Sequence, residues 1–491
     1  MTGHVSWVSV GVPSPEPETD GALRASDVRK YGRQLVRRFV AQARAADQAT
    51  IGSLVGDHLG VPPADLAVVD ETWPSYEHVN VQAALDAWLY EADAHQVHGL
   101  TDYRHRGSFG FADLIGQDPA MRLHGPRLGN VTRTTLPTGP DGQTRECLRA
   151  AILLVEDGAD RVALLFRGPD PESDMRGVVV EVVANREGAA AAVTARLREQ
   201  SVARNVFRGQ VVSFGHSMFG ERTSPLRFHT RPRLSADDLI LPSATFDDVR
   251  RQVVGVARNS DRLRAAGQHL KRGLLLYGPP GVGKTHTVRY LMGELTDTTI
   301  VELTGDTLGA IREACSIART LQPAMIVVED VDLIAQQRDH YGGETPLLFT
   351  LLNEMDGLDE DADVVFLLTT NRADLLEPAL ASRPGRVDQA VHIDLPDRES
   401  RRRLVHLYAG ALDVDLSQLD DVLDRTDGVT ASFLKELLRR AAVVAADREE
   451  QAGGGGEGAL SVLDTDLTAA LDELLDTRNQ MTRAVLGFRD D

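Results

Sequence analysis

Apolar runs in the second half of the chain predict the strands of a buried sheet. The runs are Leu274–Tyr277, Ile300–Leu303, Met325–Val328 and Val364–Leu368. They are apolar almost throughout, as expected of parallel strands that are covered on both faces. A helix is predicted from His286 to Leu295, after the segment 278–285 that follows the first run. Strands that alternate with helices in this way predict an α/β fold on a parallel sheet.

The first half of the chain has a different pattern. From Asp27 to Ala92 apolar residues recur at helical spacing, for example Tyr31, Leu35 and Phe39. Three apolar strands and an alanine-rich helix are predicted between residues 148 and 199. We therefore expect a disordered tail over residues 1–24, a helical N-terminal segment over 25–120, a small α+β domain over 125–215 and a polar connector over 216–244.

A phosphate-binding loop follows the first apolar run. Residues 278–285 fit the pattern G-x-x-x-x-G-K-[ST] at every fixed position. Residues without a β-carbon let the backbone curl around a polyphosphate, while the lysine reaches the β- and γ-phosphates and the threonine hydroxyl faces Mg²⁺. The implied cofactors are ATP and Mg²⁺. The predicted nucleotide-binding set is Gly278, Pro279, Pro280, Gly281, Val282, Gly283, Lys284, Thr285 and His286.

Polar residues end two of the later strands. Glu329 and Asp330 follow Val328, and Asn371 follows the run that ends at Leu368 by way of two threonines. The carboxyl ends of parallel strands meet at one edge of a sheet, so these side chains should lie near the phosphate loop. We expect one acid, Glu329, to help Thr285 hold Mg²⁺, and the other, Asp330, to activate water that Asn371 positions.

Residues 381–388 read Ala-Ser-Arg-Pro-Gly-Arg-Val-Asp, similar to the R-P-G-R-[FL]-D stretch of AAA+ ATPases. The resemblance extends from about Thr245 to Arg448. It implies that Arg383 and Arg386 reach the nucleotide of a neighbouring subunit, and hence that the chain forms a homo-oligomeric ring, a hexamer. A guanidinium group in that place stabilises charge on the transferring phosphoryl group.

Two further stretches support the resemblance. Residues 245–249 resemble the segment whose backbone lies beside adenine, which adds Asp248 and Val249 to the binding set. Residues 428–434 resemble the start of the sensor-2 helix in the family's lid. The implied organisation is a P-loop NTPase core over 245–395 and a C-terminal helical lid over 396–480, with a glycine-rich insert at 452–458.

The chain departs from the family at two places. In most members the strand that corresponds to Met325–Val328 ends in Asp-Glu, whereas this chain has Glu329-Asp330. Asp is one methylene shorter than Glu, so we expect slow turnover. Members that thread proteins carry an aromatic residue in a pore loop, and residues 304–309 contain none. Tyr341 falls where a second pore loop is expected and is the candidate substrate contact, with an unengaged loop tyrosine as the alternative.

Composition narrows the possible functions. A formal net charge of −20 disfavours a nucleic-acid partner, because such affinity depends on clustered Lys and Arg. Cys147 and Cys315, the only cysteines, lack metal-ligand spacing. No H-E-x-x-H pattern of a zinc protease is present. No apolar run approaches the ~20 residues of a membrane span and no signal peptide is evident, so we expect a cytoplasmic protein.

The sequence therefore predicts an ATP-hydrolysing AAA+ ring that remodels, unfolds or disassembles a protein client bound by its N-terminal domains. Two alternatives remain open. One is an ATP-gated oligomeric scaffold with slow hydrolysis and no threading, which the altered acids and the missing pore aromatic favour. The weaker one is a nucleic-acid-stimulated ATPase, whose stimulation would fade with salt.

Overall fold

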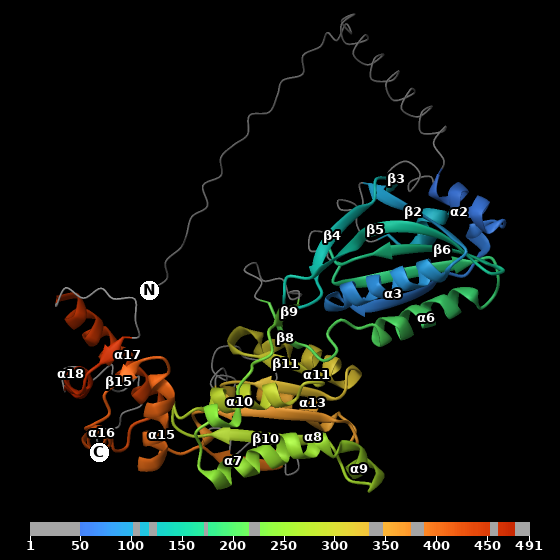
Figure 1. Cartoon of the computed structure of the whole chain (residues 1–491). Helices are drawn as coiled ribbons and strands as arrows, with labels where there is room; N and C mark the ends of the chain where they lie inside the picture. The colour runs from blue at the N-terminus through green and yellow to red at the C-terminus, as the bar shows by residue number, and fades with distance from the viewer. Residues whose placement is uncertain are drawn as a thin grey trace, which may run out of the picture.

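The computed structural model describes residues 50–101, 109–116, 125–170, 175–215, 226–332, 347–374, 387–451 and 460–476. These residues form two large β-sheets with covering helices and a third group made mainly of helices (Figure 1). The expected tail over 1–24 and the insert over 452–458 lie outside the described ranges.

The first sheet is antiparallel. Its order is β1-β7-β6-β5-β2-β3, and β4 pairs with the long β5. The strands are β1 (Val69–Pro74), β2 (Ala94–Thr101), β3 (Arg127–Gly129), β4 (Thr132–Pro137), β5 (Thr144–Asp157), β6 (Asp160–Arg167) and β7 (Gly177–Ala184). Its central strands β5 and β6 are buried along most of their length, so both faces of the sheet are covered.

Helices cover the two faces of this sheet. Buried side chains of α3 (His78–Glu91) and α6 (Ala189–Ala203) share one hydrophobic core with β5, β6 and β7. Buried residues of α2 (Ile51–Leu59) and α4 (Phe111–Ile115) share a second core with the opposite face. Two 3₁₀ turns, Pro63–Asp65 and Ser75–Glu77, complete this domain.

The structure differs here from the expected helical segment over 25–120. Strands β1 and β2 lie inside that range and pair with β7 and β5, so residues from α2 to α6 form one domain. Polar side chains make both strands hard to recognise in the sequence: β2 reads Ala-His-Gln-Val-His-Gly-Leu-Thr, and only Gly99 and Leu100 of it are buried. A strand with so few buried apolar residues carries too weak an apolar signal to be separated from neighbouring helices.

The second sheet has the order β14-β10-β13-β12-β11-β8-β9. All neighbours are parallel except β8 and β9, which are antiparallel. Its strands are β8 (Val211–Phe214), β9 (Leu226–His229), β10 (Arg272–Tyr277), β11 (Thr299–Leu303), β12 (Ala324–Val328), β13 (Val364–Thr370) and β14 (Gln389–His392). The four predicted apolar strands are present as β10 to β13. Strand β8 lies inside the range 125–215 expected of the small α+β domain, yet it pairs with β11.

Helices also flank the second sheet on both sides. Buried residues of α10 (Lys284–Glu294) and α7 (Ser243–Arg250) share one core with it. Buried residues of α11 (Ile311–Thr320) and α13 (Leu347–Asp356) share the opposite one. Shorter elements are the π-helix Arg251–Gly255, the α-helices α8 (Val256–Arg258) and α9 (Ser260–Ala265), and the 3₁₀ helices Ala236–Asp238 and Gly305–Ala310.

The lid follows the second sheet. It consists of α15 (Arg398–Ala409), α16 (Leu419–Arg425), α17 (Ala431–Gln451) and α18 (Asp464–Leu475), with the short pair β15 (Asp413–Val414) and β16 (Ser461–Val462). These helices bury their own core, which includes Phe433, Leu437 and Leu471. The predicted fold class is confirmed: a P-loop NTPase α/β sheet is followed by a helical lid.

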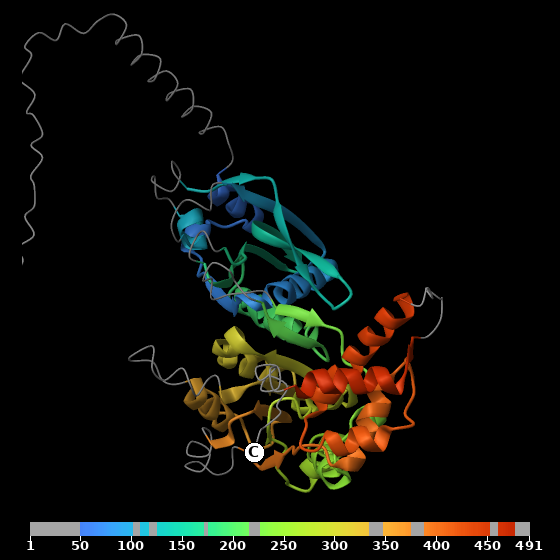
Figure 2. The same ribbon diagram turned by 90° about the vertical axis from the view of Figure 1, so that its left-hand side faces the viewer.

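The N-terminal domain packs on the edge of the second sheet that carries β8 and β9, as both views show (Figures 1 and 2). Val79 and Cys147 belong to the same buried cluster as residues of β8, β11 and α11. The Tyr76 ring packs edge-to-face on Phe214 with centroids 6.2 Å apart, and its hydroxyl is hydrogen-bonded to Ser316 of α11. The two sheets are therefore joined by a packed interface.

A carboxylate lies at this interface. Glu77 accepts hydrogen bonds from the side-chain amides of Asn80 at 2.7 Å and Asn205 at 3.1 Å. Asn205 lies just before β8, and Asn80 accepts the backbone N–H of Val206 at 2.9 Å. Burial raises the pKa of Glu77 to about 7, although both amide bonds act in the opposite direction. The domain junction therefore contains an acid that titrates near neutral pH.

Replacing Glu77 with glutamine is expected to reduce the loss of stability on going from pH 5 to pH 8. The pKa of Glu77 is higher in the folded protein than in the unfolded chain. The stability that protonated Glu77 contributes is therefore fully present below the unfolded pKa and is lost as pH rises through about 7. The glutamine oxygen keeps both amide bonds and carries no charge. Between pH 5 and pH 8 the variant should therefore lose less unfolding free energy than wild type, by on the order of 2 kcal/mol.

Urea unfolding at both pH values measures this difference. Glu187→Gln is the matched control, because Glu187 is an exposed glutamate of the same domain. Equal pH dependence of wild type and Glu77→Gln would show that Glu77 does not titrate in this range.

Candidate functional site

The phosphate loop links β10 to α10 in a conformation that its glycines permit. Gly278, Gly281 and Gly283 have φ angles of 151°, 80° and 110°, which residues with a β-carbon rarely adopt. A β-carbon at Gly278 would lie 2.1 Å from the carbonyl oxygen of Ile393, just after β14. The loop is therefore shaped both by its backbone angles and by a close approach of the neighbouring chain.

Lys284 begins α10 and points back into the loop. Its side chain is buried, and Nζ donates to the carbonyl oxygens of Gly278 and Pro279, both at 2.9 Å. Nζ also donates to Oδ1 of Asn371 at 2.7 Å. Burial lowers the pKa of Lys284, and the negative charges of Asp330 and Asp332 oppose that shift. The structure thus brings the loop lysine and the predicted asparagine together.

The two predicted acids lie at the end of β12. Asn371 donates from Nδ2 to Oδ1 of Asp330 at 3.3 Å, so its amide bridges Asp330 and Lys284. The backbone N–H of Asp330 donates to Oγ1 of Thr369 at 3.1 Å, which ties β12 to the end of β13. Asp330 has a φ of 52°, the left-handed region. Among residues with a β-carbon, Asp and Asn tolerate that region best.

Glu329 lies next to the threonine of the loop. Burial raises the pKa of Glu329, and a hydrogen bond with the Thr285 side chain opposes that shift. Its Oε1 is buried and has no hydrogen-bond partner among the described residues. A buried carboxylate oxygen without a donor, beside a hydroxyl, is a ligand set that suits Mg²⁺ carried in with a nucleotide. Thr285 and Glu329 therefore fit the metal role expected of them.

Asp332 is a site residue that the sequence reasoning missed. It is 6% exposed. Its Oδ1 accepts the Thr370 hydroxyl at 2.8 Å and the backbone N–H of Asn371 at 3.3 Å. Asp332 therefore fixes the backbone from which Asn371 reaches the lysine and Asp330. The signal in the sequence was a third acid two residues beyond Asp330, on the same segment.

The remaining predicted nucleotide-binding residues are Asp248 and Val249 on α7, the expected adenine side, and His286 on α10. Val249 is buried in the core beneath α10, whereas the half-exposed Asp248 pairs with Arg251 of the next turn at 3.4 Å. Nε2 of His286 lies 2.9 Å from the carbonyl oxygen of Asp238. These side chains pack against or bond to other protein groups. The contact of residues 245–249 with adenine stays a prediction, and it concerns their backbone.

Three predicted site residues, Arg383, Arg386 and Tyr341, lie outside the described residues. Their proposed contacts with a neighbouring subunit or a substrate remain predictions from the sequence. The described backbone flanks the two arginines at Asp374 and Val387.

The family model described as "ATPase family associated with various cellular activities (AAA)" matches residues 274–395. The chain therefore contains an AAA ATPase domain at residues 274–395. The match begins in β10 and ends just beyond β14, so it contains the phosphate loop, both acids and Asn371. The AAA+ resemblance drawn from the sequence is confirmed for this domain.

Relatives of known name match part of this chain. The ATP-dependent zinc metalloprotease FtsH 2 of Sphaerobacter thermophilus is 34% identical over 249 residues, which cover 46% of this chain and 37% of the relative. FtsH of Thermus thermophilus is 33% identical over 226 residues, 41% and 36% of the two chains. FtsH 1 of Symbiobacterium thermophilum is 36% identical over 217 residues, 40% and 36%. The matched part is little more than a third of each relative.

Within the described ranges, no cluster of three or more His, Cys, Asp or Glu residues has the arrangement of a metal site. The same ranges contain no helix with the length and hydropathy needed to cross a bilayer.

Proposed function

We propose that this protein hydrolyses ATP in an oligomeric ring, a hexamer, and uses the energy to remodel a protein client. The observation that carries the ATPase part is the contact chain from Lys284 through Asn371 to Asp330. It joins the phosphate loop to the acidic strand end at the place where a γ-phosphate and an attacking water would meet.

Each residue has a separate task in this proposal. Lys284 exchanges its loop carbonyls for the β- and γ-phosphates. Thr285 and Glu329 hold Mg²⁺, which, when bound, offsets phosphate charge. Asp330 accepts the proton of the attacking water at its carboxylate, and Asn371 holds that water in line. Arg383 and Arg386 of the adjacent subunit stabilise the charge that develops on the phosphoryl group.

The step from ATPase to remodeller rests on the relatives and on the domain arrangement. The relatives are named as ATP-dependent proteases, and this chain lacks the H-E-x-x-H pattern of a zinc protease. We therefore propose client remodelling without proteolysis by these residues. The N-terminal domain packs firmly on the edge of the ATPase sheet, which suits a module that holds a client or adaptor while the sheet and lid move.

The scaffold alternative keeps specific support. The expected pore segment forms the 3₁₀ helix Gly305–Ala310 and contains no aromatic residue. The order Glu329-Asp330 shortens the acid that faces water.

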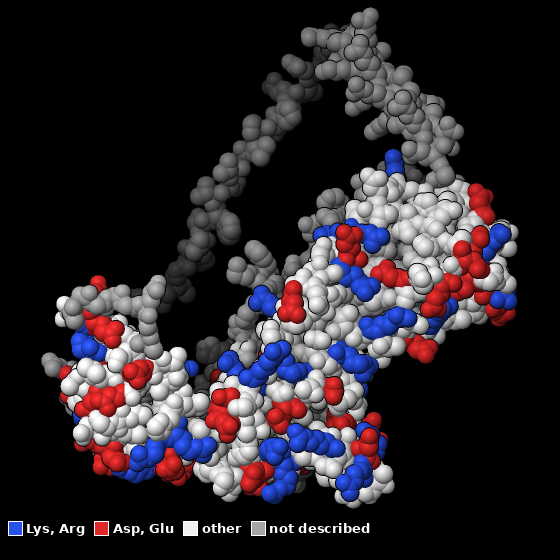
Figure 3. All heavy atoms as spheres, viewed as in Figure 1, with Lys and Arg blue, Asp and Glu red and all other residues white. Residues whose placement is uncertain are grey.

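The nucleic-acid alternative is weaker. On the face in Figure 3, Lys and Arg lie among Asp and Glu over the ATPase domain and the lid, a mixture that does not favour a polyphosphate backbone.

Replacing Arg386 with alanine is expected to lower ATP turnover about a thousandfold while ATP binding is retained, because an arginine supplied by a neighbour acts on the transition state. Steady-state hydrolysis should be recorded together with oligomer mass in each nucleotide state. Arg372→Ala is the control, since Arg372 is exposed and pairs with Asp374 at 2.9 Å.

Tyr341→Ala should reduce the stimulation of ATP hydrolysis by an unfolded protein.

The outcomes separate the candidates. Turnover that appears only in the oligomer and requires Arg386 supports the ring ATPase. An oligomer that forms with ATP but hydrolyses at background in the wild type supports the scaffold. Stimulation by DNA or RNA that fades as salt rises supports the third candidate.

A further inference from the structure

The lid touches the phosphate loop through a backbone hydrogen bond. The N–H of Ser432, at the start of α17, donates to the carbonyl oxygen of Gly281 at 3.1 Å. The neighbouring N–H of Phe433 is capped by the Thr430 side chain at 3.2 Å. The first-turn N–H of Ser432 has no acceptor within its own helix, so it is free to bond to the loop.

This contact is close. A β-carbon at Gly281 would lie 3.0 Å from Oγ of Ser432 and 3.1 Å from Oγ1 of Thr430. The start of α17 therefore packs directly against the loop. A displacement of α17 would break this contact.

The chain enters the lid on the other side of the same loop. The N–H of Ile393 donates to the carbonyl oxygen of Tyr277 at 2.8 Å. Residues 394–397 then lead to α15, whose N-cap Asp397 accepts the N–H of Ser400 at 2.7 Å. We call residues 394–397 the hinge, because they are the only covalent link between the sheet and the lid.

Arg401 connects the hinge to the segment that precedes α17. Its side chain is 5% exposed. Nη1 donates to the carbonyl oxygen of Pro396 in the hinge at 3.0 Å. Nη2 donates to the carbonyl oxygen of Leu423 in α16 at 3.3 Å and lies 3.0 Å from Oδ1 of Asp427. Only a guanidinium fork offers several fixed donors in these directions at once.

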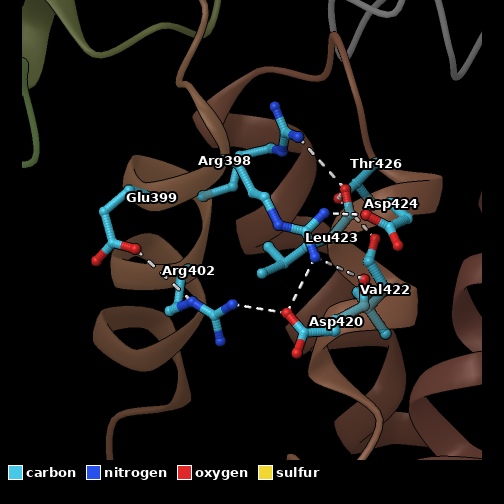
Figure 4. A network of polar contacts seen from close by, with 9 residues as sticks. Arg398, Glu399, Arg402, Asp420, Val422, Leu423, Asp424 and Thr426 are labelled. Carbon is cyan, nitrogen blue, oxygen red and sulfur yellow. Dashed lines mark hydrogen bonds and ion pairs between the residues drawn. The ribbon is translucent and has the colours of Figure 1, made fainter.

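Two other arginines of α15 provide a contrast. Figure 4 shows Arg398 and Arg402 reaching across to α16, where Arg398 pairs with Asp424 and both pair with Asp420. Their side chains are 45% and 35% exposed. Exposed ion pairs of this kind contribute little to stability or position. Of these three arginines, Arg401 is the buried one and the one that also bonds to the hinge.

We propose that Arg401 is a positioning residue for the nucleotide site. It holds α17 at a fixed angle to the hinge, so that Ser432 and Thr430 stand against Gly281 of the phosphate loop. Without it the lid keeps its own apolar core but is no longer fixed relative to the loop. This inference rests on the proposed ATP binding of the loop.

The test uses the full chain with Arg401→Lys and Arg401→Gln, and with Arg402→Gln as the matched control. Binding of a fluorescent ATP analogue, hydrogen exchange by mass spectrometry and thermal unfolding are measured for each. The dissociation constant is expected to rise about tenfold in both Arg401 variants, because a misplacement of about 1 Å is felt strongly at such a site. The control should stay at the wild-type value.

Hydrogen exchange distinguishes positioning from general support of the lid. Exchange should rise in peptides that cover residues 278–285 and 428–434 and stay unchanged in the core helices α17 and α18 beyond their first turns. Wild-type affinity in the Arg401 variants would overturn the inference. A rise of exchange throughout the lid with unchanged affinity would overturn it as well, because Arg401 would then only support the lid fold.

A second variant covers the case in which the Arg401 variants do not fold. Asp427→Ala removes one end of the connection without opening the core, since the Asp427 side chain is 86% exposed. Unlike Arg398 and Arg402, the Arg401 guanidinium that Asp427 pairs with is only 5% exposed. Loss of this partner should therefore raise the dissociation constant about threefold, and an unchanged value would overturn the inference. A wild-type protein that fails to bind the analogue would instead remove the proposed function, and the inference with it.

Discussion

Lys284→Ala is expected to abolish ATP hydrolysis, with turnover reduced about a hundredfold or more, because it removes a preorganised cation from the transferring phosphate. Lys284 is also the group that links the phosphate loop to Asn371. ATP affinity should fall at the same time, since in the proposed site the ammonium group also contacts the nucleotide in its ground state. Steady-state hydrolysis and the thermal shift produced by ATP measure the two effects.

The thermal shift gives a direct reading of binding. A ligand at a hundred times its dissociation constant stabilises a folded protein by about 2.7 kcal/mol, and this gain should disappear in the variant. Lys271→Ala is the matched control, because Lys271 lies in the same domain and its Nζ donates to the carbonyl oxygen of Leu358 at 3.0 Å. A wild-type thermal shift in Lys284→Ala would contradict the assignment of residues 278–285 as the nucleotide site.

The sequence predicted the centre of this site because its residues lie close together along the chain or at strand ends. The phosphate loop is one continuous motif with fixed spacing. Asp330 and Asn371 could be paired in advance because buried parallel strands deliver their carboxyl ends to one edge. The side-chain contact between the two residues is present at that edge. Local pattern and sheet topology were sufficient for this much.

Other features depend on contacts between distant segments, which the pattern does not contain. The sequence resembles a sensor-2 helix at residues 428–434, but the bond from Ser432 to Gly281 exists only once the lid has folded over the loop. Strand β8 follows the N-terminal domain in sequence, yet it extends the ATPase sheet. A short apolar strand carries no information about which sheet it joins.

The backbone at Asp330 gives a physical reason for the unusual order of the two acids. With a φ of 52°, residue 330 occupies the left-handed region, where Asp is tolerated better than Glu. The Asp330 N–H is held by Thr369 in this conformation. The shorter acid therefore suits the local geometry, while its reach toward water is reduced by one methylene. Slow but real turnover is the expected consequence.

Asp330→Asn is expected to lower turnover by a factor of about 10² to 10⁴, the usual contribution of a general base. The change is isosteric: Asn tolerates the left-handed backbone, and its side-chain oxygen still accepts the bond from Asn371. ATP affinity and thermal stability should therefore stay at wild-type values while hydrolysis is lost. Single-turnover hydrolysis, together with binding of the ATP analogue, measures this separation.

Asp330→Glu completes the comparison, because it restores the longer acid at a backbone position that disfavours it. We expect it to be destabilised by about 1 kcal/mol, the cost of a left-handed conformation for such a residue, and to hydrolyse ATP well above the Asn variant. Asp359→Asn, at an exposed residue in the same domain, controls for loss of charge. If Asp330→Asn hydrolysed ATP at the wild-type rate, the proton would be taken by another group, and Glu329 would be the next residue to replace.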